Sequence, residues 1–280
     1  MPCAVGLGYT DAPAGINPTT DLKGEIAMAD APAGTPAPRQ ALPLFVKQIE
    51  VLSAQRHARL AVKAQGTYAF AARANSVPIN ALEFGLAAHN YPIVFSNDER
   101  GLPVAVLGLQ AGENVFIDEA GRWERGQYVP AYVRRYPFVA LAPKDSTEYA
   151  LCIDVASDLL EQGGARPLFE DGQPSELTKK ALEFCQTYQT QQEATRQFVA
   201  AATKHSLLVP RSAKVTLRSG TARALSGFRI IDERKFSALG DNVFLDWRRR
   251  GWISLVYAHL ASQACWPALV ERASRREVVI

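Results

Sequence analysis

The spacing of hydrophobic and polar positions changes near residue 154, and this change divides the chain into two halves. Before it, short apolar runs alternate with turn-forming sequences such as Asp98-Glu99-Arg100-Gly101, which predicts hairpins or a meander of strands. After it, apolar residues recur every three to four positions over longer stretches, which predicts helices. The order predicts an α+β fold with a strand-rich N-terminal half and a helical C-terminal half.

The N-terminal half contains one predicted helix, over 80–89. Asn80 is a suitable N-cap, and Leu82, Leu86 and Ala87 lie at helical spacing. The other apolar runs are short and end at Gly, Asp or Pro, as strands do. Strands are expected toward the end of 44–52, at 91–95, 104–109 and 114–117, and as a hairpin of 138–142 with 148–153 across Pro143-Lys144-Asp145.

The C-terminal half begins with a long predicted helix, which Ser175 caps and which ends near Ser206. Its apolar stripe is interrupted at 189–192, so this turn is expected to meet solvent or a polar partner. Asp241 is expected to cap a last major helix of roughly twenty residues. Between the two helices, 214–217 and 225–231 predict one further hairpin across Arg218-Ser219-Gly220.

The two ends of the chain lack these patterns. Residues 1–40 are rich in alanine, proline and glycine and have too few large apolar groups to offset the entropy of ordering. We therefore predict a disordered tail at 1–40, a single domain at 41–265 and a frayed tail at 266–280. Translation could also begin at Met28, behind a sequence whose codons can form a ribosome-binding site; a genuine tail at 1–27 is the alternative.

Composition and charge narrow the class of protein. The chain has 280 residues, of which 48% are hydrophobic and 21% charged, with a net charge of +3. This small basic excess, without a recognisable reader motif, argues against nucleic-acid binding. No apolar run approaches the length of a membrane span, and the N-terminus lacks a secretory pattern. These features predict a cytoplasmic protein without a transmembrane segment; its oligomeric state stays open.

Catalytic and cofactor motifs give no assignment. The four histidines have no metal-binding spacing, and the four cysteines form no CxxC pair, so no metal site is predicted. There is no GxSxG nucleophile motif. Adjacent acids such as Asp118-Glu119 lie in predicted turns, where solvated side chains are the expected state. No catalytic residue and no cofactor is therefore predicted, and enzymatic activity is disfavoured without being excluded.

The segment Tyr128–Phe138 is the most distinctive in the chain, with four aromatic residues, two prolines, two adjacent arginines and no acid. Pro130 and Pro137 limit it to one short helical turn. In one interpretation its rings fill the core and Arg134 or Arg135 pairs with an internal acid such as Asp154. In the other, an aromatic-rimmed pocket uses the arginines to clamp a carboxylate, phosphate or sugar-bearing ligand. The candidate binding residues are Arg134, Arg135, Tyr132, Tyr136 and Tyr128, with Trp123 and Trp252 extending the wall.

Motifs in the same order along most of the chain carry a family resemblance. They include Leu42-Pro43-Leu44-Phe45, Ala74-Asn75-Ser76-Val77-Pro78, Tyr91-Pro92-Ile93-Val94-Phe95, Glu113-Asn114-Val115-Phe116-Ile117-Asp118, Gly121-Arg122-Trp123, the segment Tyr128–Phe138, Ala150-Leu151-Cys152-Ile153-Asp154 and Gly251-Trp252-Ile253. From about Leu42 to about Ala264 the chain resembles the SapC family of bacterial proteins.

The resemblance implies a role at the cell surface, because the family is named after a surface-layer (S-layer) locus. Related genes often lie beside those for TonB-dependent receptors, halogenase-like enzymes and cupin-like proteins, which implies nutrient uptake or surface modification. We expect an accessory or binding protein with a protein, peptide or glycan partner, so association with the surface is an expectation beside the cytoplasmic one. The alternatives are an enzyme acting with halogenase- or cupin-like neighbours, and a structural component of the surface layer.

Overall fold

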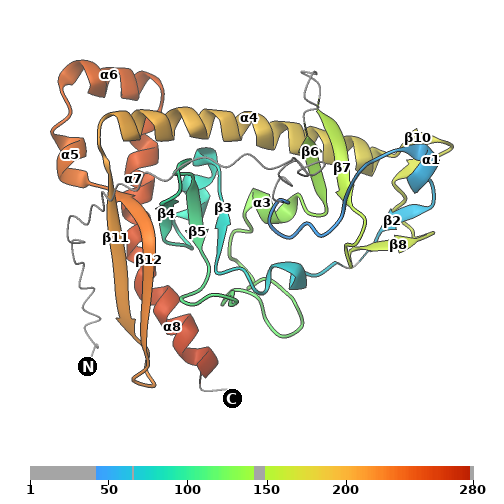
Figure 1. Cartoon of the computed structure of the whole chain (residues 1–280), viewed down its shortest axis with the longest axis horizontal. Coiled ribbons are helices and arrows are strands. Elements are labelled where there is room, and N and C mark those ends of the chain that lie inside the picture. Colours follow the sequence, from blue (N-terminus) through green and yellow to red (C-terminus); the bar gives the residue numbers. More distant parts are fainter. Residues whose placement is uncertain (1–41, 65, 142–148, 278–280) are drawn as a thin grey trace, which may run out of the picture.

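The computed structural model describes residues 42–64, 66–141 and 149–277 (Figure 1). Helix accounts for 38% of the described residues and strand for 24%, with strands concentrated in the first half and helices in the second. The predicted α+β class is therefore confirmed. The expected tail at 1–40, the question of Met28 and the turn at 143–145 lie outside the described residues.

The larger sheet has five antiparallel strands in the order β11-β12-β4-β5-β3. The predicted C-terminal hairpin is confirmed and is longer than expected, with the turn at Gly220, whose φ of +87° suits glycine. Its second strand pairs with β4, which joins the two halves of the chain in one sheet. The strands are β3 (Ser76–Pro78), β4 (Ile93–Ser96), β5 (Pro103–Val106), β11 (Leu208–Thr216) and β12 (Ala222–Ile231).

A second, three-stranded antiparallel sheet has the order β1-β7-β6, and two short strand pairs lie near it. The predicted pairing of 138–142 with 148–153 is confirmed in β6 and β7. The bounds are β1 (Ile49–Val51), β6 (Phe138–Leu141) and β7 (Ala150–Asp154), with the pairs β2 (Leu60–Val62) and β8 (Leu160–Gln162), and β9 (Phe169–Glu170) and β10 (Gln173–Pro174).

The helix α4 (Glu176–Lys204) runs along both sheets (Figure 1). The predicted cap is confirmed, because the Ser175 hydroxyl accepts a hydrogen bond from the Thr178 N–H. The remaining helices are α1 (Ala54–His57), η1 (Ala69–Ala71), η2 (Ala81–Glu83), α2 (Phe84–Ala87), α3 (Ala131–Arg134), α5 (Glu233–Ser237), α6 (Asp241–Arg249), α7 (Trp252–Ser262), η3 (Gln263–Cys265) and α8 (Trp266–Glu277).

Each half of α4 packs on a different core. Its C-terminal half joins the five-stranded sheet and the last helices in the larger cluster, where Phe95, Phe198 and Trp247 are fully buried. Its N-terminal half packs on the three-stranded sheet, where Cys185 of α4 joins a cluster with Ile153 of β7. A single helix therefore fixes the position of one sheet relative to the other.

The C-terminal region differs from the sequence prediction in two ways. The expected long helix from Asp241 is two helices, because Gly251 adopts a left-handed φ of +73° between α6 and α7. The expected frayed tail at 266–280 is wrong for 266–277, which form α8. Trp266, the first residue of α8, is fully buried, so the domain extends through this helix.

The helix predicted over 80–89 is confirmed as η2 and α2, which bury Ala81, Phe84 and Ala87. Leu82 and Leu86 lie away from this buried face and are 66% and 61% exposed. One expectation for the N-terminal half is wrong. Residues 114–117 form no strand beyond a single bridge from Ile117 to Trp123.

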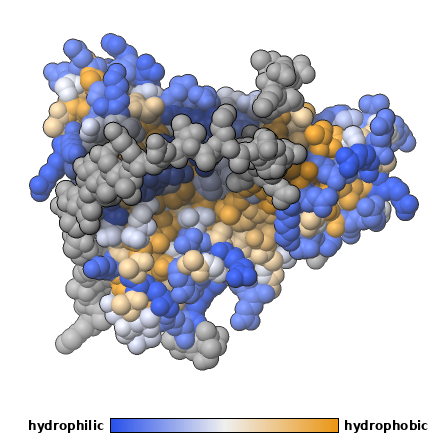
Figure 2. Space-filling view, viewed as in Figure 1, coloured by the Kyte–Doolittle hydropathy of each residue, from blue (hydrophilic) through white to orange (hydrophobic). Residues whose placement is uncertain are grey.

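Apolar side chains remain at the surface of the folded chain. Figure 2 shows them in the middle of one face, between more hydrophilic ends. Among the described residues, one helical stretch, Trp252–Glu277, is long and apolar enough to cross a membrane. Core helices of soluble proteins can have the same length and composition, and Val256 and Trp266 of this stretch are core residues.

His259 makes the stability of the fold depend on pH. Its ring is fully buried, its Nε2 accepts from the Ile231 N–H at 3.0 Å, and burial lowers its pKa from 6.5 to about 3. Above pH 6.5 both states hold a neutral ring. As pH falls from 6.5 toward 3, only the unfolded state binds the proton, so we expect His259 to reduce the free energy of unfolding by up to about 1.4 kcal/mol per pH unit.

The measurement is chemical denaturation over this pH range. In His259→Gln the side-chain oxygen can still accept from the Ile231 N–H but does not titrate. The free energy of unfolding of this variant should therefore fall less steeply than that of the wild type as the pH is lowered. His89→Gln, at an exposed histidine, is the control and should keep the wild-type slope. Equal slopes in His259→Gln and the wild type would contradict the expectation.

Candidate functional site

The Tyr128–Phe138 segment forms the predicted single turn of helix, α3. The carbonyl of Pro130 accepts from the N–H groups of Val133 and Arg134, which starts the turn. Two residues after the turn, the Tyr136–Pro137 peptide is cis and leads directly into β6. The prolines therefore bound the helix as the sequence predicts.

The carboxylate of Glu83 holds the start of this segment. Glu83 is 5% exposed, and its Oε2 accepts from the Ala131 N–H at 2.7 Å and from the Tyr128 hydroxyl at 2.9 Å. Its Oε1 accepts from the Asn80 N–H at 2.7 Å. Burial, and then the negative charge of Glu83, raise the pKa of Tyr128 to about 12, so this phenol remains a donor at neutral pH.

The carboxylate of Asp154 holds the end of the segment. It is fully buried and accepts from the N–H groups of Lys47 and Gln48 at 3.0 and 2.8 Å, and from the Tyr136 hydroxyl at 2.9 Å. The expected ion pair between Asp154 and an arginine of the segment is wrong, because neither arginine lies within ion-pair distance of it among the described residues. Backbone N–H groups from a distant part of the chain bind the carboxylate of Asp154 in place of an arginine.

Arg135 is held by aromatic rings. Its side chain is 8% exposed, and its guanidinium carbon lies 4.1 Å from the ring centroid of Tyr132 and 4.8 Å from that of Tyr188. Such cation–π contacts favour the flat guanidinium group. Within the part of the chain that the structure describes, no carboxylate lies within 4 Å of this guanidinium group. The Tyr188 hydroxyl is also buried without a hydrogen-bond partner there.

Arg134 lies on the outer side of α3 and is exposed. Its Nε donates to the Val129 carbonyl at 3.0 Å, and its Nη2 donates to the Tyr128 hydroxyl at 3.3 Å. The guanidinium carbon is 5.1 Å from the ring centroid of Phe184 on α4. The charge is therefore oriented by neutral groups and remains available to a ligand.

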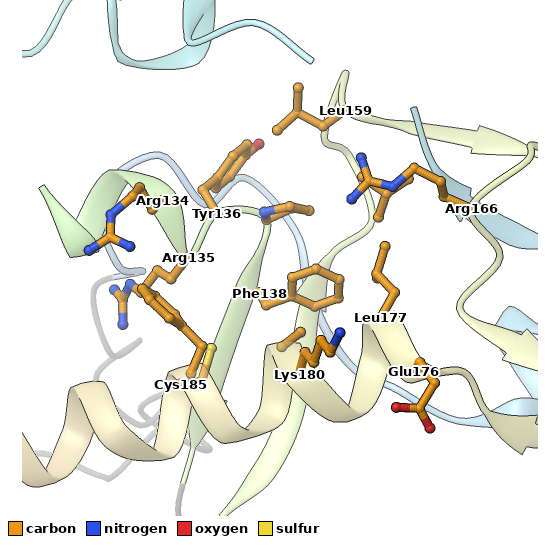
Figure 3. A pocket seen from close by; sticks show the side chains of 14 residues that line it. Arg134, Arg135, Tyr136, Phe138, Leu159, Arg166, Glu176, Leu177, Lys180 and Cys185 are labelled. Carbon is orange, nitrogen blue, oxygen red and sulfur yellow. The ribbon is translucent and has the colours of Figure 1, made fainter. Parts of the chain in front are cut away.

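A cleft of about 510 Å³ opens between α3, the start of β6 and the first turns of α4 (Figure 3). In Figure 3, Arg134 and Arg135 lie at its α3 end and Arg166 at the opposite end, with Phe138 and Leu177 between them. The volume is in the range of ordinary ligand sites. Its lining residues are Val62, Arg134, Arg135, Tyr136, Pro137, Phe138, Leu159, Arg166, Glu176, Leu177, Lys180, Ala181, Phe184 and Cys185.

The structure brings only some of the predicted site residues to this cleft. Arg134, Arg135 and Tyr136 line the cleft, and the ring of Tyr132 contacts the guanidinium group of Arg135. Tyr128 lines an adjoining hollow together with Arg134.

Trp123 and Trp252 belong to other parts of the molecule. Trp123 is 9% exposed and its Nε1 donates to the Tyr91 hydroxyl at 3.1 Å. Trp252 packs edge-on against Trp247 in the C-terminal helices. Neither ring lines the cleft.

Sequence reasoning missed the opposite end of the cleft. Arg166 follows β8, and Lys180 lies on α4. The sequence around Lys180 gives no sign that it differs from an ordinary solvated lysine on a helix. No local motif marks either residue, because their proximity depends on the packing of α4 against β6. Phe184 was recognisable only as part of the apolar stripe of α4.

The cleft offers binding groups more clearly than reactive ones. Burial raises the pKa of the Cys185 thiol to about 11, which keeps it protonated and unreactive at neutral pH. Among the described residues, no group of three or more His, Cys, Asp or Glu side chains could hold a metal ion. Apolar walls with positive charges at both ends are suited to hold an anion that has an apolar body.

These features define a mixed α+β protein with a cationic, apolar cleft. The family model of SapC matches residues 52–269, and the chain belongs to the SapC family. No curated protein matches the chain, and no solved structure does. The expected family membership is thus confirmed over most of the chain.

Replacing Glu83 by Gln tests whether its carboxylate holds α3. Glutamine has the same shape but turns one acceptor into a donor that faces donors, so we expect the free energy of unfolding to fall by about 2–3 kcal/mol. Glu183→Gln, at an exposed site on α4, should change it by less than about 0.5 kcal/mol. Urea denaturation measures both. Equal stabilities would show that the Glu83 hydrogen bonds contribute nothing net.

Replacing Arg135 tests its contact with the two tyrosine rings. We expect Arg135→Ala to lower the free energy of unfolding by about 2 kcal/mol and Arg135→Lys by about half as much, because lysine keeps the charge but lacks the flat group. Urea denaturation measures this, with Arg248→Ala, at an exposed site on α6, as the control. If the lysine variant is as unstable as the alanine variant, charge over the rings contributes little.

Proposed function

We propose that this SapC-family protein is a non-catalytic accessory protein that binds its partner in the cleft between α3, β6 and α4. The observation that carries the proposal is the state of the arginines. Arg134 is oriented by neutral groups and Arg135 by rings, and neither has a carboxylate partner among the described residues. A buried or oriented cation without a counter-charge at the wall of a cleft favours an anionic group from outside the protein.

The chemistry of the cleft supports binding over catalysis. The thiol at its wall is kept protonated by burial, and the tyrosines on either side of α3 have raised pKa values because of burial. None of these groups is poised to accept or donate a proton near neutral pH. The role we propose is therefore recognition of a protein, peptide or glycan partner, associated with the cell-surface layer or with nutrient uptake.

Filling the cleft tests this proposal. Ala181 lines it and Ala194 lies on an exposed face of the same helix, so Ala181→Trp should block the cleft and Ala194→Trp should not. The measurement is affinity capture from the native host with mass spectrometry. We expect a partner that the wild type and Ala194→Trp recover and that Ala181→Trp loses.

Two results would contradict the proposal. One is equal recovery of every partner by the three proteins after circular dichroism has shown that all are folded. The other is recovery of no partner by the wild type. Chemical conversion of a bound molecule would favour the enzymatic alternative, and concentration-dependent self-assembly without a partner would favour a structural surface-layer component.

A further inference from the structure

We infer that the ligand of this cleft is an acidic, apolar peptide segment of a partner protein, which lies along α4 from Leu177 to Gln191. This inference deepens the proposed function and rests on it. Three properties of the surface carry it: its charge, its length and its exposed leucines.

The exposed charges at the cleft are almost all positive. Arg134, Arg166 and Lys180 are exposed lining residues, and Arg134 and Lys180 have no ion-pair partner within the described ranges. The single acid in the lining is Glu176, which Lys179 binds at 2.7 Å. In Figure 3 the Glu176 carboxylate is turned away from the other labelled side chains. A complementary partner must therefore carry acids.

The surface continues beyond the cleft along α4. A second hollow of about 190 Å³ shares Arg134 and Phe184 with the cleft and reaches Gln191. From Leu177 to Gln191, α4 rises about 21 Å. An extended chain of roughly six residues covers this length, whereas a small anion would occupy only one of the two hollows. The length therefore favours a peptide segment.

Exposed leucines mark the far end of this surface. Leu82 and Leu86 line the second hollow and are 66% and 61% exposed. The lining between them and Arg166 includes the apolar side chains of Phe138, Leu177 and Phe184 beside its cations. An apolar surface rimmed by charge is typical of protein-interaction sites. A segment with acids near Lys180 and Arg166 and a large apolar residue against Leu82 and Leu86 would match the pattern.

Selection from a display library of random peptides on the immobilised protein tests the inference. We expect acidic sequences with apolar residues to be enriched, and fluorescence anisotropy should show that their affinity decreases as salt rises. Lys180→Glu should weaken a selected peptide about tenfold or more. Lys204→Glu, on the same helix but about 36 Å away, should have little effect.

A variant and a matched control also test the apolar end of the surface. Leu86→Asp should weaken the same peptide about tenfold, because it places a negative charge beside an acidic ligand and removes apolar contact. Leu245→Asp, at a leucine of α6 that is 40% exposed, should leave the affinity unchanged.

Enrichment of neutral or basic sequences, or no enrichment over the Ala181→Trp variant, would overturn the inference. So would equal losses in Lys180→Glu and Lys204→Glu, or displacement of the peptide by single-stranded RNA at similar affinity. Failure here is distinguishable from failure of the proposed function. If the native partner is captured through the cleft but Lys180→Glu does not weaken it, the cleft binds a partner that is not acidic.

Discussion

Glu83 carries a carboxylate that folding has removed from water, and this carboxylate joins two parts of the chain, η2 and the start of the Tyr128–Phe138 segment. It accepts from the N–H of Asn80 beside it and from Tyr128 and Ala131, which are 45 and 48 residues further along the sequence. A buried carboxylate is tolerated only when donors surround it. The start of α3 is therefore fixed against η2, and the position of Arg134 relative to α4 follows from that contact.

The Tyr128–Phe138 segment has no acid of its own, and its two ends are held by acids from elsewhere. Glu83 binds the first end, and Asp154 binds the hydroxyl of Tyr136 at the other. Both carboxylates accept hydrogen bonds from backbone N–H groups and tyrosine hydroxyls. The arginines are thereby left to aromatic rings and neutral oxygens, which explains how two adjacent cations come to lie at a cleft without counter-ions among the described residues.

The sequence was sufficient where local chemistry decides the structure. Ser175 as a cap and the prolines around α3 depend on neighbouring residues, and both predictions are confirmed. The ion pair of Asp154 with an arginine, which one interpretation of the sequence offered, is replaced by the backbone N–H groups of Lys47 and Gln48, more than a hundred residues away, and by the Tyr136 hydroxyl. Leu82, Leu86 and Ala87 lie at helical spacing, but only Ala87 is buried, and the segment begins as a 3-10 helix. Arg166 and Lys180 come to line the same cleft only through tertiary packing.

The polar turn of α4 makes the cleft a preformed surface. The carbonyl of Tyr188 accepts from the Asn80 side chain at 3.2 Å, and the Thr195 hydroxyl accepts from the Ala81 N–H at 2.8 Å. Gln189 donates to the Ala140 carbonyl of β6 at 3.0 Å. Both η2 and β6 are thus bound to the helix that forms the wall of the cleft. On the proposal that a partner segment binds in this cleft, a preformed surface leaves the cost of ordering to the ligand, so a rigid segment should gain the most affinity.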